Sequence, residues 1–265
     1  ADSLYVVNES TGWLSEPSIK ENNLQDYENY KYSRNEMHWG YTSWNDFFHR
    51  QIDLSLRPIT DPDNSKVIVS PNDGKVFNIA SNVSRYDQFW IKSQPYSLQN
   101  LLDDVPGVET YVGGDVYQTF LRTLDYHRFH FPISGTITDA KKVRGLTFSN
   151  LRFEDDRGGS SQAYQGHVDS RALVFIKSDD PTIGTVIYIP IGMTEISSVY
   201  VGVKKGDKVK KGDQIGYFNY GGSSVCLVFQ SGAIKTWKVE APPLKPDGLR
   251  NLGVGPDLKA RTTKL

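Results

Sequence analysis

At 265 residues, with 38% hydrophobic and 23% charged residues and a formal net charge of −1, the chain has the composition of a globular protein with one large core or two small ones. The near-neutral charge argues against a protein that coats nucleic acid, so we expect no nucleic-acid partner. A single cysteine, Cys226, excludes an internal disulfide, and no Cys/His spacing resembles a zinc site, so we expect no metal. No run approaches the roughly 18 apolar residues that cross a bilayer, and no signal peptide is recognisable; we therefore expect no transmembrane segment and a cytoplasmic location.

Residues 1–60 are rich in aromatic residues and poor in long apolar runs. We predict that they form an N-terminal helical segment of two or three short helices, packed on the core. Within this segment, apolar residues recur at helical spacing from Asn45 to Leu56, which predicts one helix over that range. The candidate N-caps are Ser15, Ser18, Thr42 and Ser43.

Residues 61–265 predict a single β-rich core. Short runs of β-branched and aromatic residues alternate with turns at Gly, Pro or Asp, which is typical of strands. A strand, a Pro-x-x-Gly turn and a second strand occur twice, at 70–76 and at 131–137. Residues 151–171 are rich in Asp, Gly, Ser and Gln, which predicts a loop. The C-terminal tail is interrupted by Pro and Gly, which predicts irregular structure. The fold class that follows is α+β, mostly β, with a sheet-rich core and short N-terminal helices.

Three polar clusters stand in strand-like surroundings: Asp73 in a Pro-Asn-Asp-Gly turn, His127 and His130 in DYHRFHFP, and Ser223 with Ser224 after two glycines. Each has a simple structural explanation, because Asp, Ser and Gly are common turn residues and histidines often pack beside aromatics. If the clusters converge, Asp, His and Ser can act as orienter, base and nucleophile. Residues three apart in a regular strand face opposite sides, so a bend would be needed to bring both histidines to one site.

The stretch FNYGGSSVCLVF places Ser223 directly after Gly221 and Gly222. It lacks the Gly-x-Ser-x-Gly turn of many serine hydrolases. Glycine tolerates the distorted backbone that brings a hydroxyl onto the preceding carbonyl, so this stretch suits a serine that attacks its own chain. Gly221 and Ser224 would then support a cleavage site between Gly222 and Ser223.

Four segments together resemble the phosphatidylserine decarboxylase family. DYHRFHFPISGTI is similar to its Tyr-His-Arg-x-His-x-Pro motif, SPNDGKV to its Pro-x-Asp-Gly segment and GGSS to its self-cleavage site. YTSWNDFFHRQIDLSLRPI resembles its Phe-x-Ser-x-x-x-Phe-Phe-x-Arg segment. Order and spacing agree over about residues 40–235, which is most of the chain.

The resemblance implies a decarboxylase that makes its own pyruvoyl cofactor. Ser223 would attack the Gly222 carbonyl, while His130 takes the proton and Asp73 orients His130. An N-to-O acyl shift and a β-elimination would leave a pyruvoyl group where Ser223 was, and would divide the chain into a β chain (1–222) and an α chain (223–265) that stay associated. The pyruvoyl carbonyl would form a Schiff base with the substrate amine and accept electrons as CO2 leaves, and His127, or His130 reused, would protonate the carbanion.

The sequence favours one of two substrates. GWLSEPS, SWNDFF, IGMTEIS and FNYGGSS look more like the fungal tryptophan decarboxylase branch, which favours a free aromatic L-amino acid as the small-molecule substrate. The alternative is the phospholipid phosphatidylserine, converted to phosphatidylethanolamine by a membrane-peripheral enzyme. Two other interpretations stay open: a serine hydrolase with an Asp-His-Ser triad, and a non-enzymatic β-rich binding module.

Overall fold

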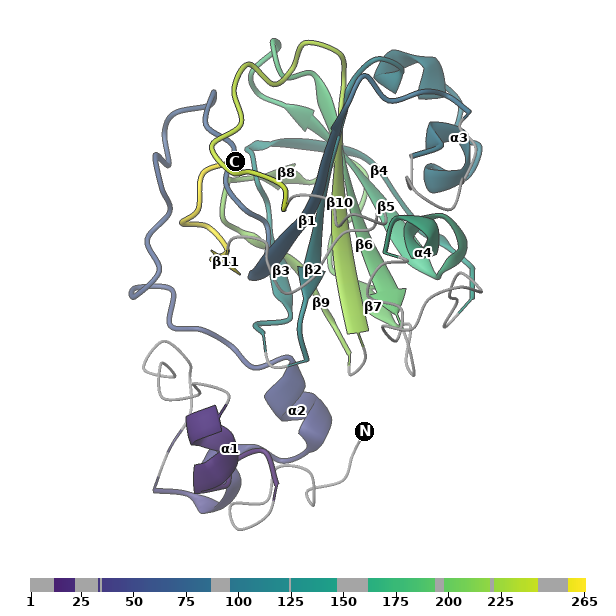
Figure 1. Ribbon diagram of the computed structural model, residues 1–265. Coiled ribbons are helices and arrows are strands. Elements are labelled where there is room, and N and C mark those ends of the chain that lie inside the picture. The colour runs from purple at the N-terminus through teal and green to yellow at the C-terminus, as the bar shows by residue number, and fades with distance from the viewer. Residues whose placement is uncertain are drawn as a thin grey trace.

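Two antiparallel sheets form the body of the protein in the computed structural model (Figure 1). The larger sheet has eight strands in the order β11-β1-β2-β10-β6-β5-β4-β8, and the smaller has three in the order β3-β9-β7. Figure 1 shows α1 and α2 beyond one end of the sheets, and α3 and α4 beside the outer face of the larger sheet. The structure describes residues 12–21, 33, 35–86, 96–123, 125–146, 162–193, 198–219, 222–242 and 257–265.

Short elements make up both sheets and the helices around them. The larger sheet contains β1 (Gly74–Ser81), β2 (Asp115–Leu121), β4 (Gly135–Val143), β5 (Arg171–Ser178), β6 (Thr185–Met193), β8 (Lys208–Val209), β10 (Gly222–Phe229) and β11 (Asp257–Leu258). The smaller sheet contains β3 (Arg128–His130), β7 (Val199–Val201) and β9 (Gln214–Phe218). The described helices are α1 (Glu16–Glu21), the 3-10 helix η3 (Met37–Gly40), α2 (Trp44–Phe48), α3 (Leu98–Leu101), the 3-10 helix η4 (Val108–Tyr111) and α4 (Gln162–Val168).

β10 lies inside the larger sheet, and its side chains alternate between two hydrophobic cores. Val225, Leu227 and Phe229 belong to the first core, which also contains residues of the smaller sheet. Cys226 and Val228 belong to the second core, which includes residues of α3 and η4. All five side chains are fully buried, and this period of two is that of a strand covered on both faces. The arrangement confirms the predicted α+β, mostly β, fold class.

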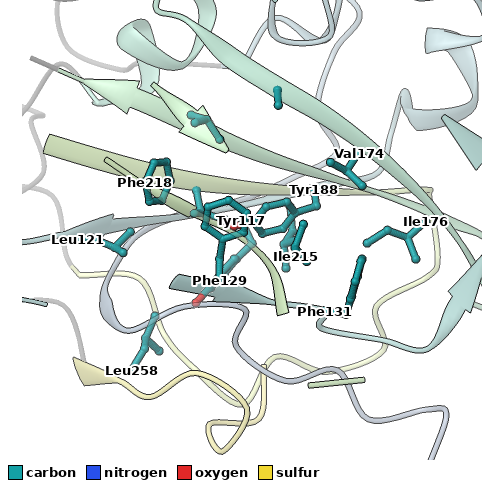
Figure 2. Close-up of a cluster of buried hydrophobic side chains, with 14 of the residues drawn as sticks. Tyr117, Leu121, Phe129, Phe131, Val174, Ile176, Tyr188, Ile215, Phe218 and Leu258 are labelled. Carbon is teal, nitrogen blue, oxygen red and sulfur yellow. The ribbon is translucent and has the colours of Figure 1, made fainter. Parts of the chain in front are cut away.

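The first core fills the space between the two sheets. Figure 2 shows Phe129 and Phe218 of the smaller sheet gathered against Tyr117 and Tyr188 of the larger one. The Phe129 ring centroid lies 5.3 Å from that of Tyr188 and 5.1 Å from that of Phe218. Aromatic pairs at these separations stabilise a core beyond the area they bury.

The N-terminal aromatic residues belong to the same first core. The Trp44 ring of α2 stacks on Trp13 at 5.5 Å and on Phe47 at 5.3 Å. Ser43 caps α2, since its side chain accepts a hydrogen bond from the Asp46 amide at 3.0 Å. The cap and the stacked rings fix α2 against the core, and α2 in turn brings Phe48 to the site described below.

The predicted helix over 45–56 is wrong beyond Phe48, where α2 ends. Asp53 accepts hydrogen bonds from the Ser55 amide (3.0 Å) and hydroxyl (2.7 Å). Such local bonds between a side chain and the backbone compete with helical hydrogen bonds. Leu56, which the helical spacing placed toward the core, is 53% exposed.

Two segments predicted to be irregular contain regular structure. Helix α4 lies within the predicted loop 151–171, and β11 of the C-terminal tail pairs antiparallel with β1. The tail continues this pairing: the Leu265 amide donates to the Ile68 carbonyl (2.9 Å), and the Thr263 carbonyl accepts from the Ser70 amide (2.7 Å). The tail therefore returns to the segment that precedes β1.

The two Pro-x-x-Gly repeats each place a glycine at the start of a strand, Gly74 in β1 and Gly135 in β4. A Cβ at Gly74 would lie 2.4 Å from the Phe120 carbonyl oxygen, and one at Gly135 would lie 2.2 Å from the Lys177 carbonyl oxygen. Neighbouring backbone is too close at both positions for any side chain. The repeats therefore allow close approach of the adjacent strand.

We predict that Gly135→Ala lowers the free energy of unfolding by about 3 kcal/mol, because its methyl group must displace the backbone of β5. Urea denaturation measures the change. The control is Gly232→Ala: the backbone of Gly232 has φ +75°, which residues with a side chain rarely adopt, but nothing lies within 4 Å of its Cβ position. The control should lose only about 1 kcal/mol, and equal losses would contradict the close-approach explanation.

Candidate active site

Ser223 is the second residue of β10, and its side chain is fully buried. Its partners across the sheet are Leu121 of β2 and Gly192 of β6. Alternation along the strand places its side chain on the same face as Val225, toward the first core. A hydroxyl buried there needs a hydrogen-bond partner.

His127 is the partner of Ser223. The Ser223 Oγ lies 3.1 Å from His127 Nδ1, and His127 Nε2 lies 3.0 Å from the Arg122 carbonyl oxygen. Since a carbonyl oxygen can only accept, Nε2 carries the hydrogen and donates it to Arg122. Nδ1 then holds a lone pair and accepts the hydrogen of the Ser223 hydroxyl. His127 is therefore in the tautomer that can take a proton from Ser223.

The surroundings of His127 keep its ring neutral. Phe48 stacks on the imidazole with ring centroids 3.8 Å apart, and Phe218 meets it edge-on at 6.3 Å. Burial disfavours the charged ring, and the positive charge of Arg50 adds to this effect, so the pKa of His127 is lowered to about 3. At neutral pH the ring has a free lone pair, as a proton acceptor requires.

His130 has a similar arrangement but does not meet Ser223. Its Nδ1 lies 2.9 Å from the Gly212 carbonyl oxygen and must donate to it, so its Nε2 accepts from the Tyr126 hydroxyl at 2.9 Å. Burial, followed by the charges of arginines that include Arg261, lowers the pKa of His130 to about 3. The hydrogen bonds described for His130 reach neither Ser223 nor Asp73.

Asp73 is held by an arginine instead of a histidine. Its carboxylate accepts from Arg57 Nη1 at 2.6 Å and from Arg57 Nη2 at 2.9 Å, and its Oδ1 also accepts from the Ala260 amide at 2.8 Å. Both side chains are buried. Removing one partner from a buried ion pair leaves an uncompensated charge and typically costs about 3–5 kcal/mol. The structure thus places Asp73 near the start of β1 but does not bring it to either histidine.

Ser224 faces away from His127, into the second core. Its Oγ donates to the Thr119 carbonyl (2.7 Å) and accepts from Gln118 Nε2 (2.9 Å). These bonds fix the backbone beside Ser223. Gly222 begins β10, and Gly221 lies outside the described residues.

The sequence did not single out four residues that hold these groups. Phe48 and Arg57 lie in the segment that resembles the family's Phe-x-Ser-x-x-x-Phe-Phe-x-Arg segment, and Tyr126 lies inside DYHRFHFP. Their position in these matched segments could have marked them as residues of the site. Arg122 contributes a backbone carbonyl to His127, and a backbone contribution leaves no mark on residue type.

A cleft of about 320 Å³ opens beside α2, and its lining includes Trp39, Tyr41, His49, Arg50 and Arg128. Arg50 lines this cleft and also acts electrostatically on His127. Within the described residues, no group of three or more His, Cys, Asp or Glu side chains is arranged to hold a metal ion. In that same part of the chain, no helix has the length and apolar character to cross a membrane.

Comparison with known proteins gives a consistent result. The sequence profile of the phosphatidylserine decarboxylase family matches residues 44–242. The chain is 36% identical over 251 residues to decarboxylase iboD of Amanita muscaria (strain Koide BX008), covering 85% of this chain and 70% of that protein. It is 29% identical over 235 residues to the L-tryptophan decarboxylase of Psilocybe cubensis, covering 82% of this chain and 54% of that enzyme. It is 31% identical over 241 residues to the phosphatidylserine decarboxylase proenzyme of Chlamydia felis (strain Fe/C-56), covering 87% and 75%.

These relatives define the class of protein, since all three are named decarboxylases, enzymes of the carboxy-lyase type. The chain belongs to the phosphatidylserine decarboxylase family. The family resemblance inferred from the four motifs is thereby confirmed. The alternatives of a serine hydrolase and of a non-enzymatic binding module find no support in these matches.

We predict that His127 and His130 stay neutral well below pH 6. Their folded pKa values are about 3, whereas an unfolded histidine has a pKa of about 6.5. Between these values the unfolded chain binds protons that the folded chain does not, so both groups lower the stability as the pH falls from about 6.5 toward 3. A titration of ¹⁵N-histidine-labelled protein followed by NMR measures this directly, with His127→Asn and His130→Asn variants to assign the signals. A titration midpoint near 6.5 for either ring would contradict the burial argument.

Proposed function

We propose that the protein is a decarboxylase that cuts its own chain between Gly222 and Ser223 and converts Ser223 into a pyruvoyl group. The observation that supports this most directly is the contact between Ser223 Oγ and His127 Nδ1 at 3.1 Å, in a buried position directly after Gly222. The residues present fit the group: residue 223 is the second residue of a strand inside the sheet, and it faces an imidazole whose lone pair points toward it.

The proposed maturation uses groups of this chain and one water molecule. Ser223 Oγ attacks the Gly222 carbonyl carbon while its hydrogen passes to His127 Nδ1, and the hydrogen is then delivered to the departing Ser223 nitrogen as the amide bond breaks. The resulting ester releases the Ser223 α-hydrogen to solvent as a proton while its Cβ–Oγ bond breaks, so Gly222 leaves as a carboxylate. A hydrogen of the freed amine then moves to Cβ, which leaves a carbon–nitrogen double bond at residue 223. Water then replaces the nitrogen at residue 223, ammonia departs, and a pyruvoyl group remains at the head of the shorter chain.

We assign the first proton transfer to His127 because its Nδ1 already accepts from Ser223. The assignment made from the family motif gave this role to His130, oriented by Asp73. For that assignment, His130 would have to leave Tyr126, and Asp73 would have to leave Arg57. The role of His130 and Asp73 stays a prediction that the experiment below distinguishes from ours.

In the decarboxylation, a pyruvoyl group supplies an electrophilic carbonyl that withdraws electrons as CO2 leaves. The protein has to exclude water and to provide a proton at the carbon that CO2 vacates. Phe48 and Phe218 cover the His127 ring and help to exclude water. His127 Nδ1 faces residue 223, and we propose that it first takes a proton from the ammonium group of the substrate and then delivers that proton to the carbon.

The strand pairing supports continued association of the two product chains. The 43 residues from Ser223 to Leu265 would form the shorter chain. At one end, β10 pairs with β2 and β6, and at the other end the tail pairs with β1. Neither contact depends on the peptide bond between residues 222 and 223.

We propose a free aromatic L-amino acid as the substrate. The support is the similarity to the L-tryptophan decarboxylase of Psilocybe cubensis, together with the segments that look like that branch. Phosphatidylserine is the alternative, since the identity to the Chlamydia felis proenzyme is close to the same value.

We predict that the purified protein appears as two chains of 222 and 43 residues on a denaturing gel and by intact mass. The shorter chain should begin with a blocked residue. Ser223→Ala should remain one chain, because it lacks the attacking oxygen. Ser224→Ala is the control that keeps the attacking oxygen: it should still be cut, but more slowly than the wild type, because the bonds that fix the backbone beside Ser223 are lost. A wild-type chain that keeps its full mass after long incubation would refute self-processing.

The same assay distinguishes the roles of the two histidines in self-cleavage. His127→Ala should slow cleavage by roughly 10³-fold or more, as expected for loss of a base next to its nucleophile. His130→Ala should slow it far less. The reverse order would transfer the role to His130 and Asp73.

We predict that the processed enzyme releases CO2 from L-tryptophan or a related aromatic amino acid without liposomes, detergent or added pyridoxal phosphate. Hydroxylamine should inactivate it by reacting with the carbonyl, and should leave the uncut Ser223→Ala chain chemically unchanged. Trapped ¹⁴CO2 from carboxyl-labelled substrate gives the rate. A processed enzyme that acts on phosphatidylserine in micelles and ignores free amino acids would establish the lipid alternative.

A further inference from the structure

The Arg122 carbonyl accepts two hydrogen bonds. One comes from His127 Nε2 at 3.0 Å, and the other comes from the Asp125 amide at 2.9 Å. A carbonyl oxygen has two lone pairs, so both bonds can form at once. The position of this oxygen decides which nitrogen of His127 carries the hydrogen. Whatever fixes the turn from Arg122 to Asp125 therefore also fixes the state of His127.

The Asp125 carboxylate closes this turn. It accepts from the Arg122 amide at 2.7 Å, from Arg122 Nε at 3.2 Å and from Arg122 Nη2 at 2.8 Å. The Asp125 side chain is only 10% exposed, whereas that of Arg122 is 54% exposed. The Asp125 carbonyl in turn accepts from Arg50 Nη2 at 3.3 Å, which ties the turn to the segment that follows α2. Asp125 is thus the less exposed of the two side chains that close the turn.

Asp73, the acidic residue of the family motif, does not have this connection. Asp73 directs its carboxylate to Arg57 and the Ala260 amide, on the side of His130 and Tyr126. Asp125 reaches His127 through a single intermediate, the Arg122 carbonyl. A carboxylate that orients an imidazole through a backbone oxygen performs the same task as one that contacts the ring directly: it selects the tautomer and the ring orientation.

We infer that Asp125 is a positioning residue for His127: by holding the Arg122 carbonyl in place, it keeps the hydrogen on Nε2 and the lone pair of Nδ1 toward Ser223. This inference rests on the proposed role of His127 in cleaving the chain. Without the carboxylate, the turn can open and the ring can adopt the other tautomer, with hydrogen on Nδ1. That tautomer donates to Ser223 and cannot accept its proton.

Rates of self-cleavage test the inference. Asp125→Ala should slow cleavage by roughly 100-fold, less than the about 10⁴-fold typical of a fixed wrong tautomer, because the Arg122 carbonyl stays nearby. Asp125→Asn keeps an oxygen that can accept from the Arg122 amide, so it should restore the rate to within about 5-fold of wild type. Asp125→Leu, similar in shape to Asp but without an acceptor, replaces the alanine variant if that variant does not fold.

The chain offers a matched control in the turn from Lys204 to Asp207. There Asp207 Oδ2 accepts from the Lys204 amide at 2.9 Å, and the Asp207 amide donates to the Lys204 carbonyl at 3.2 Å, the same two bonds as in the turn that holds His127. No histidine interaction is described at that carbonyl. Asp207→Ala should therefore cleave at the wild-type rate.

A spectroscopic measurement separates positioning from general loss of structure. In the uncut Ser223→Ala background, the ¹⁵N shifts of His127 should show hydrogen on Nε2 alone, and adding Asp125→Ala should produce a mixture of tautomers. Cleavage of Asp125→Ala at the wild-type rate, or an unchanged tautomer, would overturn the inference. Because the NMR measurement does not require cleavage, failure of the proposed function would appear separately, as a wild-type chain that never divides.

Discussion

The pairing of β10 with β2 on one edge and β6 on the other is the constraint on which the site depends. Leu121 and Gly192 flank Ser223 in the ladder, so its backbone is held from both sides. Its hydroxyl can then point in one direction, into a buried region where a polar group needs a partner. His127 meets this need because its other nitrogen already donates to Arg122. Two backbone features, the strand ladder and one carbonyl, therefore define the contact between the side chains.

The two histidines of DYHRFHFP form parallel arrangements of a carbonyl, an imidazole and a hydroxyl. In one, the Arg122 carbonyl, His127 and Ser223 follow one another; in the other, the Gly212 carbonyl, His130 and Tyr126 do so. The local backbone makes this possible. His127 precedes β3, and the register of β3 against β9 shifts next to His130, so the strict alternation of a strand does not apply to the pair. A neutral imidazole thus accepts from a serine hydroxyl in one arrangement and from a tyrosine hydroxyl in the other.

The sequence predicted those features that depend on residue type and nearby neighbours. The β-rich core, the cap at Ser43 and the family motifs all follow from short patterns. The division of work between the histidines could not be predicted in this way, because Ser223 lies 96 residues beyond His127 and the contact depends on where β3 begins. β11 escaped detection for a related reason. It has two residues, and its stability comes from β1 and from the Ala260 amide on Asp73, 187 residues away in the chain.

The pairing of the C-terminal tail with β1 has a consequence for whether the cleaved protein can refold. The tail and β10 occupy two separate places in the larger sheet, and each reaches its place through pairing between distant parts of one chain. Folding of such a topology is assisted by the covalent link, which keeps the segments at a high effective concentration. Once the link is cut as proposed, the sequence that specifies the fold is carried by two separate chains. To refold, the shorter chain would have to insert β10 between β2 and β6 of the other chain. The mature protein would therefore persist because of the height of its unfolding barrier, and a molecule that unfolds in dilute solution would not be recovered.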